Sequence, residues 1–88
     1  NFDCPDDSKD GVMSRVAETA ESEYGDYTDI DGVRVETDEG WFLIRPSGTE
    51  PLIRLNAESG EEEDAEDLFE SAKEILRDAL EAESETER

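Results

Sequence analysis

The sequence predicts an α+β domain, in which a small, four-stranded and mainly antiparallel sheet carries two helices packed on one face, in the order α-β-β-β-β-α. Two observations predict this class. Apolar residues recur at helical spacing near both ends of the chain, and the region between them holds short β-type runs separated by turn residues. Because 88 residues bury one modest core, we expect a single domain over residues 1–88, with flexible ends at residues 1–7 and 83–88.

The first helix is predicted from its cap and its apolar face. Asp7 and Ser8 can cap it, and the helical pattern continues to about Glu23 before Gly25 ends it. Its apolar face is made of residues three and four apart: Val12, Met13, Val16, Ala17 and Ala20. We expect this face to be buried against the sheet.

A hairpin is predicted after the first helix. Residues 27–30 are interpreted as a short strand, and the Asp31-Gly32 pair that follows is typical of a two-residue hairpin turn. Residues 33–37 then alternate between apolar and polar types, which places Val33 and Val35 toward the core.

Two further strands are predicted on either side of a second turn. Residues 41–44 are apolar at every position, which suits a central strand. Residues 52–57 form the last strand, and their alternation places Arg54 on the face away from the core. Three large aromatic side chains are interpreted as core: Trp41, Phe42 and Phe69.

The second helix is predicted from residue 59 onward. Ser59 and Glu62 have the spacing of a capping box, and the helix should continue to about Ala82. Its apolar stripe has the spacing i, i+3, i+4 and i+7: Ala65, Leu68, Phe69, Ala72, Ile75, Leu76, Ala79 and Leu80. The opposite side is acidic, which indicates a face in water.

The charge of the chain excludes several classes of partner. There are 28 acidic residues against 8 lysines and arginines, and the formal net charge is −20. Nucleic acids and anionic membrane surfaces require clustered cations, and no run approaches the roughly 20 apolar residues of a membrane span. A single cysteine, Cys4, is typical of a reducing compartment, so we expect a cytoplasmic protein.

The excess of acids has two interpretations. High net charge with low hydrophobicity is typical of disordered tails. The alternative is a folded domain adapted to high salt, where repulsion between surface carboxylates is screened. The periodic apolar pattern favours folding, and we expect the parent protein to come from a halophile.

One segment departs from the acidic character of the chain. Residues 41–57 contain two arginines against one acid, and at their centre stands the turn Arg45-Pro-Ser-Gly-Thr-Glu-Pro51. Gly48 can turn successive amides inward as an anion nest, and the hydroxyl groups of Ser47 and Thr49 lie beside it. Arg45 precedes the turn and Arg54 follows it, so a tight turn would bring the two guanidinium groups together.

These residue types predict a phosphate-binding cradle. The alternative is a plain loop bracketed by prolines, whose two arginines pair with nearby acids on the surface. Against a strongly anionic background, a patch kept free of carboxylates favours the cradle.

The same motif, followed by Ile-Arg and Ala-Glu, resembles the phosphate-binding loop of the α-D-phosphohexomutase family, which includes phosphomannomutase/phosphoglucomutase and phosphoglucosamine mutase. The motif belongs to the fourth, C-terminal domain of that family, whose fold agrees with the predicted order of elements. The resemblance implies that the substrate's phosphate is bound by Arg45, Ser47, Gly48, Thr49 and Arg54. Pro46 and Pro51 are interpreted as residues that stiffen the loop, and no contact is assigned to Glu50.

The resemblance also implies a function. A phosphohexomutase interconverts hexose 1-phosphate and hexose 6-phosphate through a phosphoserine and a bisphosphate intermediate, and its fourth domain closes over the sugar and holds the phosphate that is not transferred. The expected partners are the phosphorylated hexose and the three other domains. The catalytic serine and the Mg²⁺ loop are expected outside this chain, because none of its serines or aspartates has the matching context. We therefore expect no catalytic residue, no metal site and no activity from the 88 residues alone.

A second class of function is left open by the residues. The chain could be a free-standing acidic module that binds an anion or a protein without catalysis. The preferred sugar and the oligomeric state do not follow from the sequence.

Overall fold

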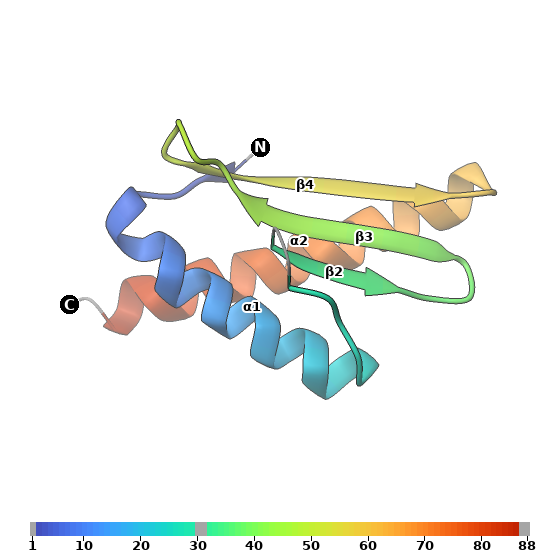
Figure 1. Cartoon of the computed structure of the whole chain (residues 1–88), viewed down its shortest axis with the longest axis horizontal. Coiled ribbons are helices and arrows are strands. Elements are labelled where there is room, and N and C mark those ends of the chain that lie inside the picture. The colour runs from blue at the N-terminus through green and yellow to red at the C-terminus, as the bar shows by residue number, and fades with distance from the viewer. Residues whose placement is uncertain (1, 30–31, 87–88) are drawn as a thin grey trace.

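The structure, a computed structural model, describes residues 2–29 and 32–86. The elements in chain order are β1 (Phe2–Asp3), the 3-10 helix η1 (Asp6–Ser8), α1 (Lys9–Tyr24), β2 (Val33–Glu36), β3 (Gly40–Pro46), β4 (Leu52–Ser59) and α2 (Glu62–Thr86). The four strands form one antiparallel sheet in the order β1-β4-β3-β2, with both helices along it (Figure 1). The predicted α+β class, with its four-stranded sheet and two helices, is confirmed.

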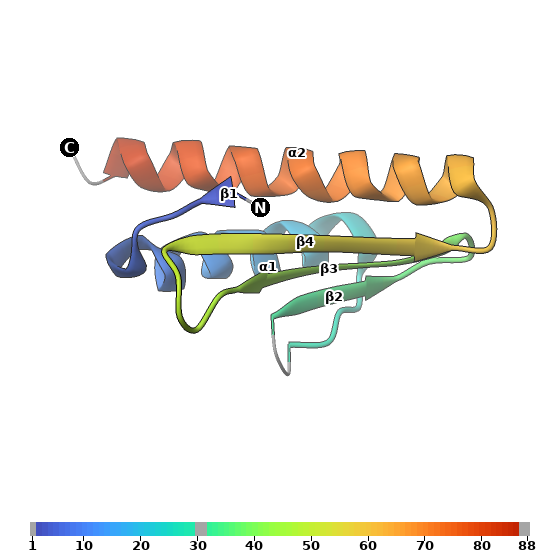
Figure 2. The same ribbon diagram turned by 90° about the horizontal axis from the view of Figure 1, so that it is seen from above.

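Both helices cover the same face of the sheet. Helix α2 packs on β3 and β4, while α1 packs beside α2 and against β2 (Figure 2). No helix of the described residues lies on the other face of the sheet (Figure 2). The predicted central position of residues 41–44 is confirmed, because β3 lies between β4 and β2. Among the described residues, no helix combines the length and the apolar character that crossing a membrane requires.

The core lies between the sheet and the two helices. Alternate residues of β2, β3 and β4 point inward, and Val35, Phe42, Ile44 and Ile53 are fully buried there. The helices supply the facing layer, which includes Val12, Val16, Ala20, Leu68, Ala72, Ile75, Leu76 and Ala79. The helical stripes predicted from spacing therefore do face the core, with Met13, Ala17, Phe69 and Leu80 half-buried at its margin.

The N-terminal segment differs from the prediction of a flexible end over residues 1–7. Phe2 and Asp3 pair with Ile53 and Leu52 as an edge strand of the sheet. Cys4 is fully buried, and its amide donates to the carbonyl of Pro51 at 2.8 Å. Main-chain pairing forms this strand, and two residues are too few to show a period of two in the sequence. Asn1 lies outside the described residues.

The strand predicted at residues 27–30 is reduced to one bridge. Thr28 exchanges both backbone hydrogen bonds with Arg34, at 2.8 and 2.9 Å, and no longer strand forms there among the described residues. Ile30 and Asp31, which complete that strand and its hairpin turn in the prediction, lie outside the described residues. The fourth strand of the sheet is β1 instead.

Trp41 corrects the core prediction. Phe42 is buried as expected and Phe69 packs half-buried against the core, but Trp41 lies on the open face of the sheet. There the guanidinium carbon of Arg34 stands 4.3 Å from the centre of the indole ring. A strand that is apolar on both faces does not reveal which face is inward, and the alternation of β3 places Phe42 inside and Trp41 outside.

The C-terminal end of α1 agrees with the prediction, whereas the N-terminal end of α2 differs from it. Gly25 ends α1 with a φ of 86°, a conformation that favours glycine. Ser59 does not form the predicted capping box, because α2 begins at Glu62 and the Ser59 hydroxyl accepts the Glu61 amide at 3.3 Å instead. The same hydroxyl bonds to the carbonyl of Glu39 in the turn before β3.

The C-terminal end of α2 also extends further than predicted. The helix continues to Thr86, past the expected end near Ala82, and residues 87 and 88 lie outside the described residues. Glu83 accepts a hydrogen bond from Arg15 of α1 at 2.9 Å. This ion pair joins the last turns of α2 to α1.

Phe42 and Trp41 are neighbours on β3 that point to opposite faces of the sheet, so truncating them should lower the free energy of unfolding by unequal amounts. Phe42→Ala should lower the free energy of unfolding by about 3–5 kcal/mol, because it leaves a cavity in the core. Trp41→Ala should lower it by less, about 1–2 kcal/mol, since the indole is half-buried on the open face beside Arg34 and leaves no cavity in the core. Urea unfolding in molar KCl, followed by circular dichroism, measures both, and equal losses would contradict the inward and outward assignment.

Candidate functional site

The loop between β3 and β4 is held by its own hydrogen bonds. The amide of Ser47 donates to the carbonyl of Leu52 at 3.0 Å. The amide of Leu52 in turn donates to the carbonyl of Glu50 at 2.8 Å. The Ser47 hydroxyl oxygen accepts the amides of Thr49 and Glu50 at 3.3 and 3.2 Å. Because Ser47 is only 9% exposed, its side chain serves first as the internal acceptor around which the loop turns.

The two predicted arginines lie side by side on the open face. Arg45 of β3 and Arg54 of β4 are direct partners in the antiparallel register, and both are exposed. Like charges directly opposite one another in a sheet are unfavourable, and an anion bound between them would relieve this repulsion. The register confirms that the turn brings Arg54 back beside Arg45.

The arginines differ in their partners within the chain. Arg54 pairs with Glu50 at 3.4 Å, with both side chains about half exposed. Such an exposed pair is worth little and exchanges easily with another anion. Arg45 makes no ion pair or hydrogen bond with any residue that the structure describes. The plain-loop alternative, in which both arginines pair with nearby acids, therefore holds for Arg54 alone within the described chain.

The structure brings all five predicted residues together. One depression of about 230 Å³ is lined by Arg45, Ser47, Gly48, Thr49 and Arg54. No carboxylate is among its lining residues, although Glu50 stands beside it through its pair with Arg54. The depression thus combines two guanidinium groups, two hydroxyl groups and a main-chain segment without a side chain.

Gly48 has a different role from the one that the sequence predicts. Among the described residues, only Gly25 and Gly32 have positive φ, so the backbone at Gly48 is open to other residue types. Apart from its two neighbours in the chain, a Cβ atom at Gly48 would meet no described atom within 4 Å. The glycine leaves open space beside the arginines instead of permitting a special turn.

The sequence predicts a nest of several successive amides that face an anion, but in the described loop a single amide is available. Pro46 and Pro51 have no N–H, and the amides of Ser47, Thr49 and Glu50 are bonded within the loop. The amide of Gly48 is the loop N–H that bonds to no described residue, so it remains for a ligand. Two of the amides expected in the nest, those of Thr49 and Glu50, donate instead to the Ser47 hydroxyl, and they are therefore not available to a ligand.

Lys9 is a residue of this site that the sequence analysis missed. From the first turn of α1 its ammonium donates to the carbonyl oxygens of Ser47 and Glu50, each at 2.7 Å. It also pairs with Asp6 at 2.6 Å, and its side chain is only 12% exposed. No motif spacing connects a lysine to acceptors 38 and 41 residues away. The sequence offers one hint of a special role for Lys9, which is that Lys9 and Lys73 are its only lysines.

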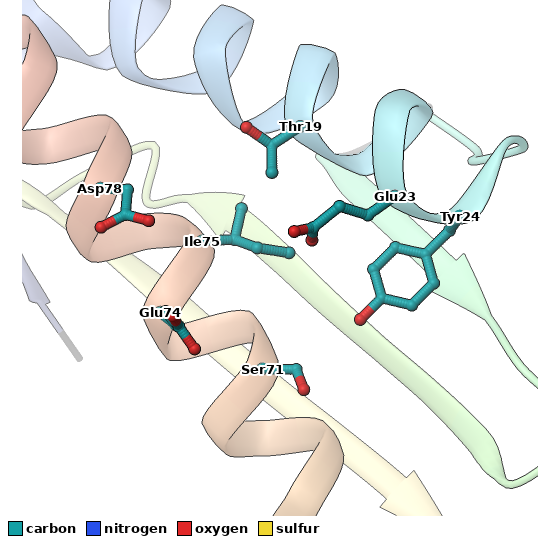
Figure 3. Close-up of a pocket in the computed structure, with 7 residues that line it drawn as sticks. All are labelled: Thr19, Glu23, Tyr24, Ser71, Glu74, Ile75 and Asp78. Atoms are coloured by element: carbon teal, nitrogen blue, oxygen red, sulfur yellow. The ribbon is translucent and has the colours of Figure 1, made fainter.

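A larger depression lies between the two helices and has the opposite charge. It measures about 440 Å³, and its walls come from α1 (Thr19, Glu23 and Tyr24) and α2 (Ser71, Glu74, Ile75 and Asp78) (Figure 3). Three carboxylates and no cation line it, so it repels phosphate. Within the described residues, no three His, Cys, Asp or Glu side chains gather closely enough to hold a metal ion. The depression at the end of β3 and β4 differs from it in being lined by two arginines and by no carboxylate.

Comparison with known proteins places these features in a family. Residues 1–75 match the family described as phosphoglucomutase/phosphomannomutase, C-terminal domain. The chain is 47% identical over 79 residues to a probable phosphoglucosamine mutase of Methanopyrus kandleri, and 44% identical over 80 residues to the phosphoglucosamine mutase of Methanocaldococcus jannaschii. Each alignment covers 90% of this chain but only 18% of the relative, so the chain spans less than a fifth of these proteins.

The surroundings of two glycines predict unequal effects of an added methyl group on stability. Gly48→Ala should change the free energy of unfolding by no more than about 0.5 kcal/mol, since the new Cβ meets open space at an ordinary φ. Gly40→Ala should destabilise the domain by more than about 1 kcal/mol, because its Cβ would overlap the carbonyl oxygen of Glu58. Thermal unfolding compares the two variants. Strong destabilisation by Gly48→Ala would show that the loop itself requires this glycine.

Proposed function

The chain belongs to the family of phosphoglucomutase/phosphomannomutase C-terminal domains, and from this membership we propose that it is the phosphate-binding domain of a larger phosphohexomutase. The relatives are phosphoglucosamine mutases, so the proposed substrate is a glucosamine phosphate, which the parent enzyme isomerises between its 1- and 6-phosphates. The single observation that carries the proposal is the pairing of Arg45 with Arg54 at a depression without carboxylates, in a chain of net charge −20.

The groups at the depression have defined roles in this proposal. Arg45 and Arg54 neutralise the two charges of a phosphate dianion, and the planar fork of each guanidinium offers paired N–H donors. The Gly48 amide and the Thr49 hydroxyl, which bond to no described residue, donate to the remaining oxygens. Ser47 contributes through its hydroxyl proton, because the oxygen already accepts two amides. Glu50 leaves Arg54 when phosphate binds.

The proposed contribution to catalysis is positional. By holding the phosphate that is not transferred, the domain fixes the sugar so that its other end faces the phosphoserine supplied by another domain. The bisphosphate intermediate then turns over, and the second phosphate returns to the serine. Mg²⁺ would neutralise the transferring phosphate in the parent enzyme. The proposal places its site in another domain of that enzyme.

The proposed setting is a cytoplasm of high salt concentration. Cys4, the single cysteine of the sequence, is buried, and a lone cysteine suits a reducing compartment. The net charge of −20 on 88 residues gives strong self-repulsion, which molar salt screens. The partners in this proposal are the sugar phosphate and the other three domains. No specific observation favours the free-standing acidic module over this function.

An amide NMR titration in molar KCl tests phosphate binding directly. Glucosamine 6-phosphate should shift the amide signals of Gly48 and Thr49 and the guanidinium signals of Arg45 and Arg54. Glucosamine itself should leave these signals unchanged, and it is the matched control because it carries the same ammonium group. Equal shifts with both ligands, or none with either, would contradict phosphate recognition by this chain.

Two arginines on the same sheet face provide the matched variants. Arg45→Ala should weaken glucosamine 6-phosphate binding by about 10- to 100-fold, the loss expected for a charge-assisted hydrogen bond. Arg34→Ala removes the same charge from the same face, but Arg34 lies over Trp41 and outside the depression. It should change affinity less than about threefold, through the long-range field alone. Similar losses for both variants would indicate attraction by charge without a defined site.

Salt dependence of stability tests the proposed high-salt setting. The melting temperature should rise with KCl concentration, because the Debye length falls to about 3 Å at 1 M. Each kcal/mol of relieved repulsion corresponds to about 4–8 °C. A triple variant on the exposed side of α2, Glu66→Gln with Asp67→Asn and Glu81→Gln, should show a smaller rise. A melting temperature independent of KCl would remove the support for high-salt adaptation.

A further inference from the structure

We propose that Lys9 is a positioning residue, which orients the Ser47–Gly48 peptide so that the Gly48 amide faces the bound phosphate. The inference rests on the proposed function and adds to it a residue outside the phosphate-binding motif. It depends on the hydrogen bonds of one ammonium group and on the geometry of one peptide plane.

The ammonium of Lys9 has all three of its N–H groups occupied. Two donate to the carbonyl oxygens of Ser47 and Glu50 at 2.7 Å, and the third faces the carboxylate of Asp6 at 2.6 Å. Distances this short are typical of charge-assisted hydrogen bonds. The Lys9 side chain is 12% exposed, so solvent competes little for these contacts. The ammonium thus holds both ends of the loop at once.

The peptide geometry transmits this contact to the depression. No peptide bond among the described residues is cis, and in a trans peptide the C=O and the following N–H point in opposite directions. With the Ser47 carbonyl directed at Lys9, the Gly48 N–H is directed away from Lys9. Gly48 lines the depression together with Arg45 and Arg54, and its amide is the loop donor that bonds to no described residue.

The same contact keeps negative dipole ends away from the ligand. If the Ser47–Gly48 peptide rotated, its carbonyl oxygen would turn toward the depression and oppose a phosphate. The hydrogen bonds of the loop itself do not prevent this rotation, because none of them uses the Ser47 carbonyl or the Gly48 amide. Lys9 is the described residue that fixes this plane.

The position of Lys9 in the fold suits this role. It is the first residue of α1, and the start of α1 lies at the same end of the domain as the β3–β4 loop (Figure 1). Lys73, the other lysine, lies on α2 and pairs with Glu70 at 3.8 Å on the acidic side of that helix. It offers a control with the same charge and side chain but no contact to the loop.

The first measurement is made without ligand, in molar KCl, on the 88-residue chain. Lys9→Met should speed amide hydrogen exchange at Thr49 and Glu50 by about tenfold or more, because these amides depend on a loop that the substitution releases. Lys73→Met should leave their exchange unchanged. Lys9→Arg keeps the charge but lacks the compact geometry of an ammonium, so it should give an intermediate rate.

The second measurement is the affinity for glucosamine 6-phosphate. Lys9→Met should weaken binding by about tenfold, the factor for one misplaced charge-assisted donor, and Lys73→Met should bind like the unsubstituted chain. Lys9→Arg should fall between them. If Lys9→Arg binds as tightly as the unsubstituted chain, the charge alone matters and the positioning role is wrong.

The two measurements separate this inference from the proposed function. Faster exchange in Lys9→Met together with no binding by the unsubstituted chain would support the role of Lys9 and contradict phosphate binding. Normal binding together with unchanged exchange and affinity in Lys9→Met would support phosphate binding and overturn the role of Lys9. If Lys9→Met does not fold, the exchange rates of Lys9→Arg decide, and rates equal to those of the unsubstituted chain overturn the inference.

Discussion

The register of β3 against β4 is the constraint on which both the core and the site depend. The seven pairs from Gly40–Ser59 to Pro46–Ile53 determine which side chains point toward the helices. A shift by one residue would reverse every side chain of one strand. It would expose Phe42 and at the same time separate Arg45 from Arg54. The burial of the core therefore stabilises the pairing of two like charges, which would not persist in an isolated hairpin.

The charge of the surrounding surface sets this arginine pair apart from the rest of the molecule. With 28 acids in 88 residues, most of the molecule repels an anionic ligand. The larger depression between α1 and α2 has three carboxylates in its walls, whereas the smaller one at the loop has two guanidinium groups. In the proposed function, charge and not volume favours the smaller depression for phosphate. Molar salt weakens the distant repulsion but leaves direct hydrogen bonds to the ligand largely intact.

Sequence patterns predicted the features that are periodic or local. The helical stripes and the outward position of Arg54 follow from spacing, and the five residues of the motif gather because a short turn joins their strands. The missed features have no such signal. The edge strand at Phe2 is formed by backbone pairing, Trp41 stands in a run that is apolar on both faces, and Lys9 reaches the loop from 38 residues away. Long-range contacts of single side chains leave no period in a sequence.

The loop divides its polar groups between holding its own shape and meeting a ligand. The Ser47 hydroxyl and two amides are used internally, and two carbonyl groups are held by Lys9. This leaves Arg45, the Gly48 amide and the Thr49 hydroxyl as groups without a partner in the described chain. A loop fixed in this way needs little reordering when an anion binds, so less of the binding energy is lost to conformational entropy. In the proposed function, the two arginines attract an anion through charge, and the Gly48 amide adds a donor of fixed direction.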